Sequence, residues 1–329
     1  MLALRRLDIV VIFKAAPMNK LLYTFQKAHK PPHITFLLCG WLLAIGFGVL
    51  PTVADDPPAS GNDLVTIRVV SDVLDLQPGH QFTLAVEYSI KPGWHLYWRN
   101  PGANGMAPTV EVTAPDGFEI GELIFPRPQI FGTGATATYG YEGTVLLMVP
   151  VKCPPQLDAV EVQFELTLDW VVCKVACLLG ESQQRVRLPV SLPGREVTPN
   201  PAGARLITSW MSRVPRPMTA GARTRGFTAE MAPQNRLVLK GVSGASSSAI
   251  YIPGGTPGVS PKAPGPVSGV LSNGSFIFEI PMSIIPEDSL GEPLRANGLI
   301  LLGSYERPRA LEIDVSVDSS EVRRENSEG

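Results

Sequence analysis

The stretch VQFELTLDWVV, residues 162–172, decides the fold class, because apolar and polar side chains alternate along it. Its apolar residues occupy every second position: Val162, Phe164, Leu166, Leu168, Trp170 and Val172. A period of two predicts a β-strand with one buried and one exposed face. The strand leads directly into the cysteine pair Cys173 and Cys177.

Further strand signals surround this stretch, separated by turns that contain Pro or Gly. The predicted strands are Leu64–Val70, Phe82–Ile90, Thr109–Thr113, Glu119–Phe125, Thr144–Val151 and Gln184–Leu192. No amphipathic helix is predicted among them. The 31 Gly and 32 Pro residues of the 329-residue chain also favour many turns between short strands. We therefore expect an antiparallel β-sandwich.

A second strand-rich block follows a Pro-containing boundary at Pro193–Pro201 and a short predicted helix at Ala204–Arg213. Its predicted strands are Arg236–Val242, Ala249–Ile252, Phe276–Met282, Leu299–Gly303 and Ala310–Val317. Pro253–Gly269 is dense in Gly, Pro and Ser and is expected to be a long loop. The block contains neither cysteine nor histidine, so we expect a second, smaller β-sandwich without a catalytic centre.

The N-terminal region has the features of a secretory signal. Six basic residues precede the apolar run Ile34–Leu50, and Thr52–Ala54 offers a small-residue cleavage site. The alternative is a retained membrane anchor, since a run of 17 residues is at the lower limit of a span. The expected organisation is a signal peptide at 1–54, a linker at 55–63, the first sandwich at 64–193, a connector at 194–226, the second sandwich at 227–318 and a disordered tail at 319–329.

A formal net charge of −2 and the absence of a long basic run argue against nucleic acid as a partner. After signal cleavage we expect an exported, periplasmic protein whose cysteines can oxidise. Its only membrane contact would be through an uncleaved N-terminal segment.

Cys173 and Cys177 flank three residues, which lets their Cα atoms come within the roughly 4.4–6.8 Å that a disulfide needs. By alternation Cys173 lies on the face of Asp169, opposite the apolar face, and Cys177 lies in the connection to the next strand. Lys174 would favour a thiolate, whereas Asp169 and Glu181 would oppose it. A bridge that closes a loop of five residues contributes only about 2 kcal/mol to the stability of the fold, so it would be a weak structural crosslink. The spacing leaves a redox pair, a structural bridge and a copper(I) site open.

Cys153 is the odd cysteine of the exported part and is expected to be a semi-buried free thiol. His80 and His95 are not at ligand spacing from any cysteine, so no metal site that combines histidine with cysteine is predicted, and no bound cofactor.

Three segments in this order resemble one known family: Gly93–Gly102 (GWHLYWRNPG), Tyr139–Gly143 (YGYEG) and Asp169–Cys177 (DWVVCKVAC). Together they are similar to the amino-terminal periplasmic domain of the thiol:disulfide interchange protein DsbD, in its ScsB-like branch. The resemblance covers residues 64–193. Leu294–Leu299 and Arg309–Glu312 resemble the second sandwich of that branch more weakly.

The resemblance implies an immunoglobulin-like sandwich in which Cys173 and Cys177 cycle between disulfide and dithiol. It places the stretch from Phe131 to Tyr139 where a cap loop shields the pair. Tyr141 belongs to the same candidate site, with Asp169 and Lys174 as supporting residues. The competing interpretation of both tyrosines is packing in the core.

The resemblance further implies a thiol:disulfide oxidoreductase component without a cofactor. A membrane protein would reduce the pair, and the domain would then reduce periplasmic clients such as disulfide isomerases, cytochrome c maturation factors or metal-tolerance proteins. Known members continue into transmembrane and thioredoxin-like domains, whereas this sequence ends at Gly329, so a separate electron donor is expected. The alternative is a non-catalytic protein-binding module with a structural disulfide.

Overall fold

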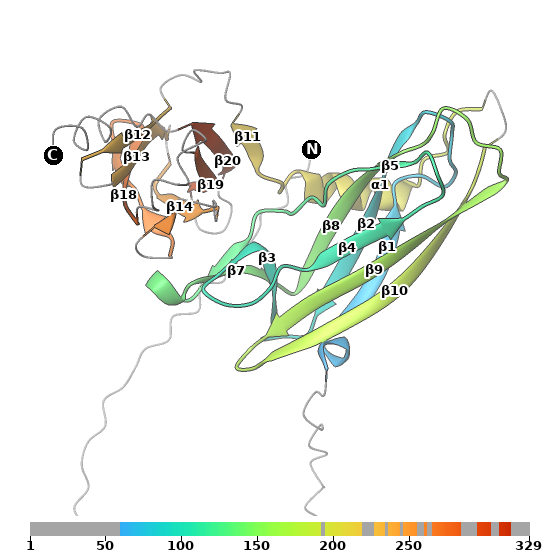
Figure 1. The fold of residues 1–329 in the computed structure, drawn as a ribbon, viewed down its shortest axis with the longest axis horizontal. Coiled ribbons are helices and arrows are strands. Elements are labelled where there is room, and N and C mark those ends of the chain that lie inside the picture. Colours follow the sequence, from blue (N-terminus) through green and yellow to red (C-terminus); the bar gives the residue numbers. More distant parts are fainter. Residues whose placement is uncertain are drawn as a thin grey trace, which may run out of the picture. The chain divides into compact units, whose positions relative to one another are not determined.

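The computed structural model describes residues 60–191, 195–218, 227–233, 236–243, 246–254, 260–261, 265–283, 295–303 and 309–316. The predicted signal peptide, most of the linker and the predicted tail lie outside these residues. Strands dominate the described part (Figure 1), which confirms the all-β prediction. None of the helices in the described ranges is long and apolar enough to cross a membrane.

The first sandwich consists of two antiparallel sheets. One sheet has the order β1 (Val65–Ser71), β2 (Gln81–Ile90), β8 (Thr144–Lys152) and β5 (Glu119–Ile120). The other has the order β10 (Cys177–Pro189), β9 (Glu161–Cys173), β3 (His95–Gly102), β7 (Thr138–Glu142) and β6 (Gln129–Phe131), and β4 (Thr109–Thr113) pairs with β9. Figure 1 shows β9 and β10 as one long hairpin.

The two sheets pack face to face through large aromatic side chains. Phe82 of β2 meets Phe164 of β9 edge to face at 5.7 Å between ring centroids. Tyr88 of β2 meets Trp170 of β9 in the same way at 6.0 Å. The alternating residues of β9 from Val162 onward are therefore buried between the sheets, as the sequence pattern predicts. The immunoglobulin-like sandwich follows from this packing.

Several strands differ from their predicted bounds. The predicted strand Glu119–Phe125 is reduced to β5 and an isolated bridge between Ile124 and Met148. The predicted strand at Gln184 begins seven residues earlier, because β10 pairs with β9 along its whole length. Strands β3, β6 and β7 were not predicted. Gly or Pro interrupts the patterns of β3 and β7, β6 has only three residues, and cross-strand pairing forms all three.

The second block is also a sandwich of two sheets. One sheet has the order β11 (Arg216–Met218), β20 (Arg309–Ser316), β19 (Arg295–Leu302), β14 (Ala249–Pro253) and β16 (Val267–Ser268). The other has the order β12 (Thr228–Ala232), β13 (Arg236–Val242), β18 (Ser275–Ser283) and β15 (Ser260–Pro261), and β17 (Val270–Ser272) pairs with β18. Tyr251 and Phe278 join the two sheets, with ring centroids 5.9 Å apart.

The predicted loop Pro253–Gly269 is wrong in part, because β15 and β16 fall inside it. Residues 255–259 and 262–264 of this segment lie outside the described part of the chain. The pairing of β15 with β18 and of β16 with β14 supplies the hydrogen bonds that composition does not reveal.

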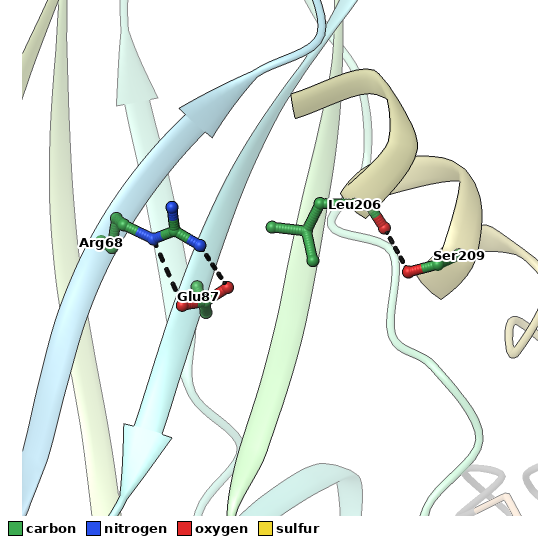
Figure 2. A network of polar contacts seen from close by, with 4 residues as sticks. All are labelled: Arg68, Glu87, Leu206 and Ser209. Carbon is green, nitrogen blue, oxygen red and sulfur yellow. Dashed lines mark hydrogen bonds and ion pairs between the residues drawn. The ribbon is translucent and has the colours of Figure 1, made fainter. Parts of the chain in front are cut away.

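Helix α1 (Pro201–Met211) connects the two blocks along the chain and begins three residues before its predicted start. The Asn200 side chain caps it by accepting the Gly203 N–H at 3.2 Å. Ile207 and Trp210 are buried in the core of the first sandwich. Figure 2 shows the Leu206 side chain pointing from α1 toward the sheet.

Figure 2 also shows an ion pair between β1 and β2 on the exposed side of their sheet. Arg68 donates to both carboxylate oxygens of Glu87, at 3.2 and 2.8 Å. The Arg68 side chain is 62% exposed, so this pair contributes at most about 1 kcal/mol.

Candidate functional site

Cys173 and Cys177 form a disulfide across the end of the β9–β10 hairpin. Their Cα atoms are 4.2 Å apart, and the two residues are direct partners in the ladder. Cys177 is thus the first residue of β10, which corrects the expectation that it lies in the connection. The turn between them is closed by the Lys174 N–H, which donates to the Ala176 carbonyl at 3.2 Å.

The two sulfur-bearing residues differ in accessibility. Cys173 is only 4% exposed and packs with Tyr97 and Val171 on the outer face of the sheet. Cys177 is an exposed residue at the tip of the hairpin. The predicted face of Cys173, opposite the apolar core, is confirmed by this packing. An attacking thiolate can reach Cys177 more readily than Cys173.

Two ring-bearing residues of β3 lie beside the disulfide. His95 is the ladder partner of Cys173, and their side chains therefore stand next to each other on the outer face. Tyr97 lies on the same face two residues later, and its hydroxyl donates to the Cys177 sulfur at 3.6 Å. Cys173 thus has both rings of β3 beside it, and Tyr97 also contacts Cys177.

Phe131 closes the site from β6. Its ring stacks on His95 with 4.8 Å between centroids and an interplanar angle of 22°. The His95 and Tyr97 rings in turn meet edge to face, with 5.2 Å between their centroids. The end of the predicted cap segment at Phe131 therefore reaches the disulfide through His95. The residues that follow, 132–136, are exposed.

Burial changes the protonation of both β3 residues. Partial burial lowers the pKa of His95, and the nearby carboxylate of Glu142, its ladder partner on β7, opposes this effect. The buried Nε2 atom of His95 has no hydrogen-bond partner among the described residues. Burial raises the pKa of Tyr97, so its hydroxyl keeps its proton at neutral pH. A neutral imidazole and a phenol that can donate a proton thus flank the bridge.

The other predicted site residues lie at different distances from the bridge. Lys174 is exposed in the turn, and a Cβ atom on Gly93 would lie 3.4 Å from its ammonium nitrogen. Asp169 is exposed on the outer face, four residues before Cys173, and accepts the Thr109 hydroxyl at 3.3 Å. Within the described ranges, neither side chain has a hydrogen bond to a sulfur atom.

Tyr139 and Tyr141 are buried in the core of the first sandwich, at 2% and 5% exposure. The Tyr141 hydroxyl donates to the Pro126 carbonyl at 2.7 Å. Their positions agree with the packing interpretation, and their backbone in β7 pairs with β3. These tyrosines therefore support the strand that carries His95 and Tyr97.

Cys153 is a free thiol and is buried between the two sheets, away from the outer face that carries the bridge. Burial raises the pKa of this thiol to about 11. A thiol that stays protonated in a packed core is a poor nucleophile.

Sequence reasoning missed His95 and Tyr97 as site residues. The signal was present, since both lie in Gly93–Gly102, a segment that carries the family resemblance. Recognising that segment as a strand would have placed them on one face. Within the described ranges, no three His, Cys, Asp or Glu side chains gather into a group that could hold a metal ion.

Comparison with known proteins places this geometry in a family. Residues 67–189 match the family model described as thiol:disulfide interchange protein DsbD, N-terminal. The crystal structure of the N-terminal periplasmic domain of ScsB from Proteus mirabilis is similar at a TM-score of 0.54 and 16% identity, covering 78% of this chain and 94% of that one. None of the curated proteins compared with the chain matches it.

A match to the major pilin subunit BcpA of Bacillus cereus reaches a TM-score of only 0.26 at 10% identity, covering 77% of this chain and 68% of that one. The ScsB domain has the same fold, and its match extends beyond the first sandwich. The family match spans β1 to β10 and includes the disulfide hairpin. The first sandwich of this chain is therefore a domain of the DsbD N-terminal family.

Proposed function

We propose that this protein is a thiol–disulfide exchange module that passes electrons to client proteins through the Cys173–Cys177 pair. The observation that carries the proposal is the asymmetric bridge, with Cys177 exposed at the hairpin tip and Cys173 buried beside His95. The bridge closes a turn that the β9–β10 ladder already holds, so its structural contribution is about 2 kcal/mol. The family match adds the thiol:disulfide interchange class.

In the proposed reaction the reduced pair donates two electrons to a client disulfide. The Cys177 thiolate attacks one client sulfur, the client S–S bond breaks, and the other client sulfur leaves as a thiolate that takes up a proton. Cys173 then loses its proton and attacks Cys177 in the mixed disulfide. This step releases the client dithiol and restores the Cys173–Cys177 bridge.

The residues around the bridge support this chemistry. The Tyr97 hydroxyl, which contacts the Cys177 sulfur, stabilises a thiolate at that position. Phe131 and His95 cover the Cys173 side, which directs a client to Cys177. No bound cofactor is required for the exchange.

The proposal includes the partners and the compartment. Clients are thioredoxin-like proteins with a reducible disulfide, and a separate membrane protein reduces the module. The chain acts in the periplasm after export. The likeness to a periplasmic ScsB domain and the N-terminal apolar run support this location. The same proposal assigns the redox chemistry to Cys173 and Cys177, a cap role to Phe131 and supporting roles to Asp169 and Lys174.

The test is the reduction potential of the pair, measured by equilibration with thiol buffers and mass-spectrometric trapping. A value of roughly −120 to −270 mV is expected for an exchange protein. A value below about −300 mV would identify a structural bridge and replace the proposal with the protein-binding module.

Single-cysteine variants distinguish the roles of the two cysteines. Cys173→Ser is expected to trap a mixed disulfide on Cys177, whereas Cys177→Ser is expected to trap little, because Cys173 is buried. Equal exchange by wild type and by a variant that lacks both cysteines would contradict the proposal. Cys153→Ser is the matched control and is expected to exchange like wild type.

A further inference from the structure

A groove of about 610 Å³ lies on the outer face of the sheet that carries the disulfide. Residues of β4, β9 and β10, the loop before β4 and the short helix η1 (Gly61–Asp63) line it. The Asn62 side chain of η1 accepts the Glu181 N–H at 2.9 Å, which fixes one wall on β10. The groove is thus built from regular elements.

The groove begins next to the bridge. Leu179 lines it and lies two residues after Cys177 on the same face of β10, so about 7 Å separates their positions. On the other side, the loop before β4 packs against the Tyr97 ring. A Cβ atom on Gly105 would lie only 2.1 Å from that ring, so only glycine fits there. Tyr97, which contacts Cys177, therefore also supports the loop that presents Met106 to the groove.

The lining combines negative charge with exposed apolar side chains. Its carboxylates are Glu111, Asp169 and Glu181, and none of its lining residues is basic. Leu179 is 71% exposed and Met106 is 57% exposed. Single exposed apolar side chains are ordinary, but two that line one acidic groove beside a reactive bridge suit a partner that is both basic and apolar.

We propose that this groove binds the client segment next to the client's reactive cysteine, and that it selects segments with a basic and an apolar side chain. A lysine or arginine of the client would meet Glu111 and Glu181, and a leucine-like side chain would contact Leu179 and Met106. The docked segment places the client sulfur at Cys177. This inference rests on the proposed exchange function and names its specificity.

The experiment uses two synthetic peptides of equal length. Each carries one cysteine in a mixed disulfide with thionitrobenzoate, flanked either by lysine and leucine or by glutamate and serine. The Cys177 thiolate of the reduced protein attacks the peptide sulfur, the S–S bond breaks, and the coloured thionitrobenzoate anion leaves with the electron pair. The same derivative of N-acetylcysteine amide reports the chemistry without the groove.

The variants are matched in charge. One double variant, Glu111→Lys with Glu181→Lys, replaces two negative charges of the groove by positive ones. The control double variant, Glu122→Lys with Asp158→Lys, makes the same change in net charge at exposed residues that do not line the groove. Leu179→Ser tests the apolar contact. In the protein with its native groove, the lysine–leucine peptide is expected to react about tenfold faster than the glutamate–serine peptide at low salt. At about 0.5 M salt this preference is expected to shrink.

The double variant with the reversed groove charges is expected to lose the preference for the lysine–leucine peptide. The control double variant is expected to retain this preference. An unchanged preference in the variant with the reversed groove charges would overturn the inference, as would equal rates of the two peptides with wild type. Failure of the proposed function looks different. In that case the reduced protein would react with the small derivative no faster than a variant without Cys173 and Cys177.

Discussion

Tyr97 is the described residue whose side chain is seen to donate to the accessible sulfur of the bridge. Its hydroxyl lies 3.6 Å from the Cys177 sulfur, and burial keeps it protonated. A hydrogen bond to a charged group contributes about 1.5 kcal/mol, so Tyr97→Phe is expected to slow exchange at pH 7 about tenfold. The pKa of the Cys177 thiol is expected to rise, as measured by the pH profile of alkylation of the reduced protein.

Tyr139→Phe is the control for this prediction, because Tyr139 is equally buried on the neighbouring strand β7 and, among the described residues, has no hydrogen bond to sulfur. It is expected to leave the alkylation profile unchanged. The same profile for Tyr97→Phe and wild type would show that the hydroxyl does not stabilise the thiolate.

His95 makes the stability of the fold depend on pH. Burial lowers its pKa in the folded protein, so between that value and the unfolded value of about 6.5 the unfolded chain binds more protons. The contribution of neutral His95 to the free energy of unfolding is fully present above about pH 6.5. It is lost as the pH falls below 6.5 and through the lower pKa of the folded protein. The carboxylate of Glu142 opposes the shift but does not reverse it.

His95→Phe keeps a ring against Phe131 and cannot titrate. We expect urea unfolding of wild type to show lower stability at pH 5.5 than at pH 7.5, and the variant to show a smaller difference. His80→Gln, at an exposed position, is expected to behave like wild type. An equal pH dependence for His95→Phe and wild type would contradict the assignment.

At the scale of the element, the β9–β10 hairpin carries the bridge and depends on one glycine for its packing. A Cβ atom on Gly180 would lie 2.4 Å from the indole of Trp170, its ladder partner. Trp170 fills the core beneath the strand, so the ring cannot easily move.

Gly180→Ala is therefore expected to lower the free energy of unfolding by about 1–3 kcal/mol, as overpacking does elsewhere. Chemical denaturation measures this change. Gln183→Ala, at an exposed position of the same strand, is expected to change it by less than about 0.5 kcal/mol. An unchanged free energy of unfolding in Gly180→Ala would contradict this prediction and would mean that the hairpin can shift over Trp170.

The same hairpin shows how far sequence pattern reaches. β9 was predicted nearly to its ends, because 162–172 alternates without interruption and its packing requires that alternation. β3 was missed because Asn100, Pro101 and Gly102 at its end are typical of a turn. Its partners β7 and β9 make it a strand, and neither is a neighbour in sequence.

At the scale of the whole molecule, the second sandwich has a core of its own. Phe278 is fully buried there, between Tyr251 and Phe276. Phe278→Ala is expected to destabilise this sandwich by about 3–5 kcal/mol, through lost transfer energy and the cavity left behind. Because the block contains no cysteine, the exchange rate of the Cys173–Cys177 pair is expected to stay within about twofold of wild type.

Limited proteolysis and the thionitrobenzoate assay measure the two effects in parallel. Phe164→Ala, in the core of the first sandwich, is the contrasting variant and is expected to reduce both stability and exchange. A parallel loss of exchange in Phe278→Ala would show that the second sandwich takes part in the reaction.

The sequence by itself determined the all-β class, the position of the central strand and the cysteine pair at its end. These features depend on a period of two and on spacing, which act over a few residues. The tertiary structure decided which sulfur is accessible, and it brought His95, Tyr97 and Phe131 to the bridge. It also formed the acidic groove from β4, β9 and β10. Such placements depend on which distant strands pair, and local periodicity does not specify the partners.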